Sequence, residues 1–194
     1  MSTEPDLQEL LSKVTGLEKP EVSALLSISK LKTLAKGDRF IEAGQVPRCM
    51  GFVVRGLFRY VYLDREGNEF TKNFLSENSF ITSYSAMVQQ QQSWFSIEAL
   101  EDSEVLRFDF LSWKRISQDN SQWDRFLLRM LEKAFFIKEK RERELLLLDA
   151  ESRYRIFIQE FPGLDKRVKQ HIIASYLGIK PESLSRIRKH AALT

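Results

Sequence analysis

The sequence contains one cysteine, two histidines and no long apolar run. The lone Cys49 excludes an intramolecular disulfide framework, and it excludes a four-thiolate zinc or iron–sulfur site built by one chain. Uninterrupted apolar runs span no more than five residues, against roughly 20 for a transmembrane helix. No basic segment followed by an apolar one opens the chain, so residues 1–11 are not predicted as a signal peptide. We therefore expect a cytoplasmic protein with no metal, no cofactor and no membrane partner.

The sequence also lacks the residue groupings that catalysis requires. It has no glycine-rich phosphate loop and no Ser/His/Asp constellation, and its two histidines, His171 and His190, do not form a cluster. Cys49 has no nearby histidine that would activate its thiol as a nucleophile. These absences predict that the protein is not an enzyme.

What is present is a chain able to fold, with an uneven charge distribution. Its 194 residues are 43% hydrophobic and include 14 Phe, enough to build a substantial core. The net charge of +3 combines two opposite parts. Residues 1–150 carry 21 Lys and Arg against 23 Asp and Glu, whereas residues 151–194 carry 9 against 4. A small basic segment on a slightly acidic body suggests a nucleic-acid-binding module, although a charged run is more often a solvated face.

The first half of the chain changes from helical to β-strand character. Helical spacing of apolar residues predicts two short helices before residue 31. Residues 31–110 then read as short strands rich in Val, Phe, Tyr and Ile. Glycines separate these strands, namely Gly37, Gly44, Gly51, Gly56 and Gly67. The clearest hairpin covers residues 56–75, and residues 80–88 predict a short helix. This pattern predicts an antiparallel, jelly-roll-like β-roll within an α+β protein.

Residues 112–148 return to helical periodicity and predict one long helix. Such a helix would approach roughly 50 Å at 1.5 Å per residue, longer than a single β domain covers. Its charged stretch, residues 138–144, contains oppositely charged pairs at i,i+4 that suit an exposed face. We expect its apolar side to pack against a second copy of the chain, with an intramolecular partner as the alternative. The predicted dimerisation residues are Trp123, Leu127, Met130, Ala134 and Ile137.

The C-terminal segment has helix-turn-helix spacing. Pro162 and Gly163 end a preceding helix that begins near residue 150. Ala174 supplies a small residue where two helices cross, and Gly178, four positions later, tolerates the left-handed turn between them. Pro181 presets the first turn of the second helix. The outward side of that helix carries residue types that read base edges or bind phosphates. The predicted DNA-binding residues are Lys180, Glu182, Ser183, Ser185, Arg186, Arg188 and Lys189.

This order of parts resembles the Crp/Fnr superfamily of bacterial transcription regulators. The resemblance covers nearly the whole chain and is carried by residues 34–38, Gly44, residues 52–56, the turn at 64–69 and the helix-turn-helix. It implies a cyclic-nucleotide-binding-domain fold, a homodimer and an inverted-repeat DNA site, with bases contacted through Glu182 and Arg186. We expect three parts: a sensor domain at 1–111, a dimerisation helix at 112–148 and a DNA-binding domain at 149–194.

The resemblance fails at the ligand pocket. Family members that bind cyclic nucleotides use a Gly-Glu pair and an Arg-Ser or Arg-Thr pair to hold the ribose and the phosphate. The positions that align with these pairs are occupied by Thr82-Ser83 and Ser93-Trp94, so the arginine is absent. We therefore predict no binding of cAMP or cGMP. The degenerate pocket, Thr82, Ser83, Tyr84, Ser93 and Trp94, is expected either to take another small-molecule effector or to be filled.

Family members continue from the recognition helix into a β-hairpin wing, whereas only residues 190–194 follow here. DNA affinity is then expected to depend on the recognition helix and on dimerisation. The predicted partners are double-stranded DNA, a second copy of the chain, RNA polymerase and an unidentified effector. The alternative function is a ligand- or partner-binding β-roll module with weak or no DNA binding. A steep dependence of DNA binding on salt would separate the two.

Overall fold

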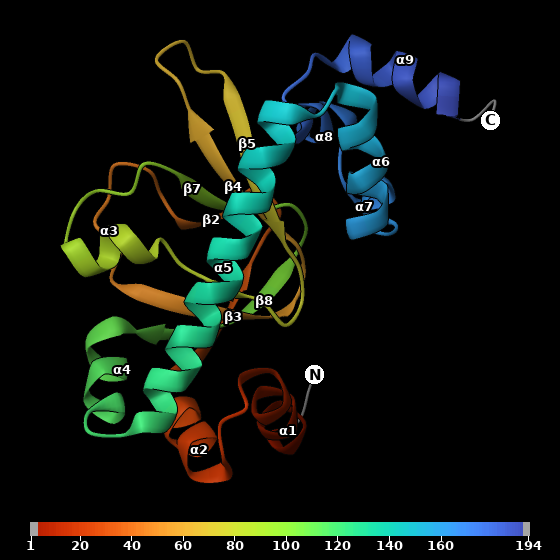
Figure 1. The fold of residues 1–194 in the computed structure, drawn as a ribbon. Helices are drawn as coiled ribbons and strands as arrows, with labels where there is room; N and C mark the ends of the chain where they lie inside the picture. The colour runs from red at the N-terminus through yellow and green to blue at the C-terminus, as the bar shows by residue number, and fades with distance from the viewer. Residues whose placement is uncertain (1–3, 192–194) are drawn as a thin grey trace.

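A computed structural model describes residues 4–191 of the chain, so the predictions about residues 1–3 and about a wing after residue 191 concern positions outside the described residues. The β-roll consists of two four-stranded antiparallel sheets, as the sequence predicts (Figure 1). The first sheet has the order β1-β8-β3-β6 and the second the order β2-β7-β4-β5. The strands are β1 Ser29–Leu34, β2 Arg39–Ile41, β3 Cys49–Arg55, β4 Phe58–Leu63, β5 Glu69–Leu75, β6 Phe80–Ile81, β7 Ser96–Ala99 and β8 Ser103–Asp109.

A buried apolar core joins the two sheets. Val53 and Val105 of the first sheet meet Phe58 and Ile97 of the second, and all four side chains are buried. The predicted hairpin is formed by β4 and β5. The carboxylate of Asp64 accepts hydrogen bonds from the backbone N–H groups of Glu66 and Asn68, which closes the hairpin turn. Gly67 takes the left-handed backbone conformation (φ 84°) that the turn requires.

Within the described residues, two helices precede the strands of the β-roll, one lies between β6 and β7, and the others follow β8. They are α1 Glu4–Thr15, α2 Lys19–Ser27, α3 Tyr84–Gln89, α4 Phe110–Ser117, α5 Ser121–Leu147, α6 Ala150–Glu160, α7 Leu164–Arg167, α8 Gln170–Leu177 and α9 Pro181–Ala191. The helix expected over 80–88 is shorter, because Phe80 and Ile81 instead pair with β3 as strand β6. None of the helices in residues 4–191 combines the length and apolar character needed to cross a membrane.

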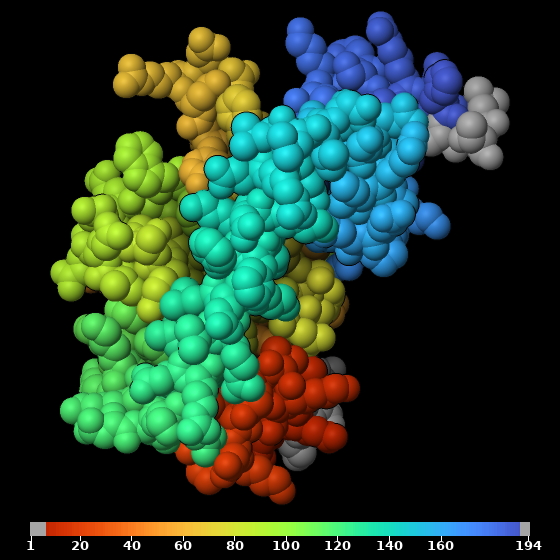
Figure 2. Space-filling model, viewed as in Figure 1, coloured from red at the N-terminus to blue at the C-terminus, as the bar shows by residue number. Residues whose placement is uncertain are grey.

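The long helix expected over residues 112–148 is in fact two helices. It breaks between Ser117 and Ser121, because Asp119 adopts a left-handed conformation (φ 56°) and Asn120 caps the helix that follows. The side chain of Asn120 accepts a hydrogen bond from the N–H of Gln122 at 3.0 Å. The second helix, α5, has 27 residues and runs across the β-roll with its outer face uncovered (Figures 1 and 2).

The predicted dimerisation stripe on α5 faces the protein itself. Trp123 is only 1% exposed, and it packs with Trp113 and Phe126 in a core shared with α1, α2 and β8. Leu127 and Met130 pack against the same core. Only the last two residues of the predicted set, Ala134 and Ile137, are exposed. The apolar periodicity was correct, but the partner of the first three residues is intramolecular.

Helices α6–α9, residues 150–191, form a separate layer that we call the C-terminal module. Its core contains residues from all four helices, including Phe157, Leu164, Ile173 and Leu184. Three buried residues of the β-roll side belong to the same cluster: Leu57, Phe74 and Leu100. The C-terminal module therefore shares its hydrophobic core with the β-roll and packs directly against it.

Candidate nucleic-acid interface and sensor pocket

The C-terminal module holds α8 and α9 at a tight turn. Gly178 ends α8 in the left-handed conformation (φ 66°), and its N–H donates to the carbonyl of Ser175 at 3.2 Å. Ala174 is fully buried, which allows close approach of the helices. The side chains that the sequence assigned to a shared core do meet there: Ile173, Leu177, Ile179, Leu184 and Ile187. The turn residues therefore place α9 on the surface of the module.

The face of α9 predicted to contact DNA is exposed, with one exception. The exposed members of the predicted set are Lys180, Glu182, Ser183, Ser185, Arg186 and Lys189. Arg188 is half-buried, and its guanidinium lies 3.7 Å from a carboxylate oxygen of Asp165 in α7. This places Arg188 in an ion pair inside the module. The exposed remainder presents three cations and one carboxylate within about two and a half helical turns.

The predicted sensor pocket brings together three of its five residues. Ser83 and Ser93 are buried, and their hydroxyl groups are hydrogen-bonded to each other at 2.9 Å. Thr82 exchanges two hydrogen bonds with the Tyr60 hydroxyl, which donates to the Thr82 carbonyl at 3.1 Å and accepts from the Thr82 N–H at 3.2 Å. Trp94 is 84% exposed, and Tyr84 packs against a different core at the base of α5, so neither belongs to this group. The polar groups of the pocket thus satisfy one another.

A lysine and three aromatic rings, which the sequence analysis did not single out, fill the neighbouring space. Lys72 of β5 places its Nζ 4.7 Å from the centre of the Phe95 ring, 5.8 Å from Tyr60 and 5.9 Å from Tyr62. Tyr60 and Phe95 stack with ring centroids 4.9 Å apart. Burial lowers the pKa of Lys72, and the positive charge of Lys138 in α5 lowers it further. Burial also raises the pKa of Tyr60 to about 12.

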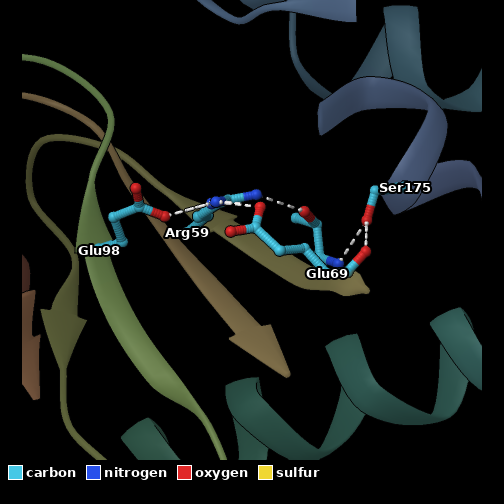
Figure 3. Close-up of polar contacts among 5 residues, drawn as sticks. Arg59, Glu69, Glu98 and Ser175 are labelled. Atoms are coloured by element: carbon cyan, nitrogen blue, oxygen red, sulfur yellow. Dashed lines mark hydrogen bonds and ion pairs between the residues drawn. The ribbon is translucent and has the colours of Figure 1, made fainter. Parts of the chain in front are cut away.

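The other face of the same sheet carries a buried ion cluster (Figure 3). Arg59 of β4 is 3% exposed and pairs with carboxylates on both neighbouring strands. Its Nη2 lies 2.6 Å from Glu69 of β5 and 2.5 Å from Glu98 of β7. A buried guanidinium needs such partners because an unpaired charge in an apolar environment is strongly disfavoured. The cluster links β5 and β7 to β4, which lies between them in the sheet.

These features match known proteins in fold. Residues 31–120 match the model of the cyclic nucleotide-binding domain. The regulator CLP of Xanthomonas campestris, whose structure is described as c-di-GMP responsive, has a TM-score of 0.76 at 12% identity, covering 91% of this chain and 92% of CLP. FixK2 of Bradyrhizobium japonicum has a TM-score of 0.75 at 18% identity, covering 86% and 85%. A protein from Eubacterium rectale assigned to the Crp/Fnr family has a TM-score of 0.74 at 16% identity, covering 95% and 88%.

No curated protein matches the chain significantly in sequence. The match to the cyclic nucleotide-binding domain covers residues 31–120, slightly less than half of the chain. The structural matches extend the likeness to nearly the whole chain, which has the fold of Crp/Fnr-type transcription regulators. The α+β fold and the Crp/Fnr resemblance predicted from the sequence are therefore confirmed.

Proposed function

We propose that this protein is a homodimeric DNA-binding transcription regulator whose recognition helix is α9. The observation that carries the proposal is the exposed cationic face of α9, set on a two-helix turn with a buried alanine and a left-handed glycine. This face would enter the major groove, and the pair of α9 helices in a dimer would read half-sites about 34 Å apart. The proposed division is a sensor at 1–111, an intersubunit segment at 112–148 whose contact is made by α5, and a DNA-binding unit at 149–194.

The residues of α9 divide into two proposed roles. Glu182 and Arg186 are assigned to base edges, since carboxylates accept from cytosine N4 and arginine donates two bonds to guanine. Ser183 and Ser185 lie beside them on the exposed face. Lys180 and Lys189 are assigned to phosphates at the two ends of the helix. Arg188 supports the helix through Asp165 and leaves the set of proposed DNA contacts.

The proposed dimer contact is the outer face of α5. This face carries Leu128, Phe135 and Leu146, which are all more than half exposed and lie on one side of the helix, about two and three turns apart. Exposed apolar side chains in this number on one helix indicate a surface that is covered in the assembly. RNA polymerase, a small-molecule effector and a cytoplasmic location remain predictions from the sequence.

We expect Arg186→Ala to weaken binding to the preferred DNA site by about 1–3 kcal/mol per half-site and to relax the base preference at one position. The variant loses the guanidinium, which would donate two hydrogen bonds to one guanine. Fluorescence anisotropy with duplexes selected from a random library measures both effects. Lys189→Ala is the contrasting variant, expected to weaken all duplexes alike and to reduce the salt dependence. Unchanged affinity and base preference in Arg186→Ala would remove this residue from the interface.

We expect calorimetric titration with cAMP or cGMP to give no binding heat at micromolar concentrations. Ser83 aligns with the family's ribose-binding glutamate and Ser93 with its phosphate-binding arginine; the two hydroxyls bond to each other and bring no positive charge. Two hydroxyls do not replace an arginine that pairs with a phosphate in a half-buried site. Micromolar binding of either nucleotide would show that the pocket opens and that Lys72 can serve the phosphate instead.

A further inference from the structure

The C-terminal module is fastened to the β-roll by three chemically different contacts, centred on β5 and the loops beside it. We propose that these contacts form a latch that fixes the orientation of α9 without an effector; this rests on the proposed DNA-binding function and adds its regulation. The latch consists of an aromatic contact at Phe74, a hydroxyl contact at Ser175 and an ion cluster at Arg167. Each part joins a residue of the module to the β-roll.

The aromatic contact is made by Phe74 of β5. Its ring lies 5.1 Å from Tyr176, 5.8 Å from Phe161 and 6.2 Å from Phe157, measured between centroids. Phe74 is 4% exposed, so the β-roll inserts one ring among three rings of the module. Contacts of this kind are favourable beyond the area they bury, because ring edges meet ring faces.

The hydroxyl contact joins α8 to the backbone of β5 (Figure 3). Ser175 accepts a hydrogen bond from the N–H of Thr71 at 2.8 Å and donates one to the carbonyl of Glu69 at 2.7 Å. Since β5 is the edge strand of its sheet, these backbone groups have no neighbouring strand on that side. One side chain thus takes the place of a strand, and Glu69 is itself held by Arg59.

The ion cluster joins α7 to two loops of the β-roll. Arg167 lies 2.6 Å from Glu101 and 3.0 Å from Glu77. Hydrogen bonding to Glu101 raises the pKa of Arg167 despite the opposing effect of partial burial. Glu77 in turn accepts a hydrogen bond from the backbone N–H of Gly56, so the cluster is also anchored to the turn between β3 and β4.

The junction between α5 and the module is also braced. Arg153 of α6 donates to the carbonyl of Leu148 at 2.5 Å and to the carbonyl of Leu177 at 3.0 Å. The guanidinium of Arg141 in α5 lies 3.9 Å from the ring centre of Tyr176. These contacts therefore hold α5 and the C-terminal module together on both sides of residues 148 and 149, which connect α5 to α6.

The latch leaves the DNA-binding face open. The residues proposed to contact DNA on α9 are exposed in the latched arrangement, so docking does not block them. In the predicted sensor pocket the hydroxyls of Ser83 and Ser93 are bonded to each other, and Lys72 lies over three aromatic rings, so these side chains already have partners within the chain. We infer that the latch sets the spacing of the two recognition helices in advance, which favours simultaneous binding of both half-sites.

The test compares the double variant Ser175→Ala/Arg167→Gln with the matched control Ser85→Ala/Arg155→Gln. Ser85 is exposed on α3, and Arg155 pairs with Glu151 on its own helix. The probes are a duplex enriched by the wild-type protein from a random-sequence library, its isolated half-site, and versions with the half-sites moved by one to three base pairs. We expect the latch variant to bind the full site about tenfold more weakly, to bind the half-site as before, and to lose its preference for one spacing.

A second measurement does not depend on DNA. Amide hydrogen exchange at Thr71 is expected to accelerate about tenfold in Arg167→Gln alone, because release of one contact loosens the module at Ser175. Unchanged exchange at Thr71 together with an unchanged spacing preference would overturn the latch. If the wild-type protein enriches no duplex, the proposed function fails, and the exchange measurement alone decides for or against the latch.

Discussion

Replacement of Phe74 by alanine is expected to lower the free energy of unfolding by about 3–5 kcal/mol. The loss is large because the ring is buried at the centre of three others, contributed by α6, α8 and the segment after α6. Its removal would leave a cavity at the boundary between the β-roll and the C-terminal module. Chemical denaturation followed by tryptophan fluorescence and by circular dichroism measures the effect, since all three tryptophans, Trp94, Trp113 and Trp123, lie outside the module.

The same strand provides the control for this prediction. Phe70 is also a phenylalanine of β5, but it is 51% exposed. Phe70→Ala is therefore expected to change the stability by no more than about 0.5 kcal/mol. In Phe74→Ala the two probes are expected to separate, with the module losing helix before the tryptophans report unfolding. Equal losses in the two variants, or coincident transitions with a small loss in Phe74→Ala, would contradict the shared core.

Phe135→Glu is expected to disrupt the proposed dimer and leave a monomer. Phe135 is 61% exposed on the outer face of α5, so a glutamate there costs little within one chain. In a dimer built on this face, the same glutamate would bring two like charges into an apolar contact. Sedimentation velocity measures the change of mass. Affinity for a full inverted repeat is expected to fall by about 10²-fold or more, because each half-site is then bound separately.

Leu31→Glu is a suitable control for the effect of adding charge. Leu31 is 52% exposed on β1, away from α5, and should leave the protein dimeric. Circular dichroism is expected to show the same helix content in both variants. A Phe135→Glu protein that sediments as the wild type would assign the dimer contact to another surface and would refute the role proposed for this face.

The sequence was most informative where local chemistry dictates the backbone. The hairpin at 56–75 follows from alternating apolar residues and a turn that closes on Asp64 and Gly67. The two-helix turn follows in the same way from Ala174 and Gly178. Each of these features depends on residues close together in the chain, so the pattern and the outcome coincide.

Three other features were not predicted from the sequence. The break before α5 falls at Asp119, without glycine or proline, although Asn120 is a common helix cap and was the available signal. Three of the predicted dimerisation residues, Trp123, Leu127 and Met130, pack within the chain, and the sequence does not separate them from the outer face because both sides of α5 carry apolar residues at helical spacing. Lys72 of β5 contacts aromatic rings from β4 and from the residue before β7. These contacts join residues far apart in the sequence, so an alternating strand pattern does not predict them.

The position of Ser175 has a consequence for solubility. An edge strand with free backbone groups is a template for pairing with another chain, and proteins commonly protect such edges. Here α8 covers the edge of β5, and the hydroxyl of Ser175 bonds one backbone N–H and one backbone carbonyl of this strand. Detachment of the module would therefore expose the unpaired backbone groups of β5. Variants in which the module is loosened should aggregate by strand pairing through β5 before the β-roll unfolds.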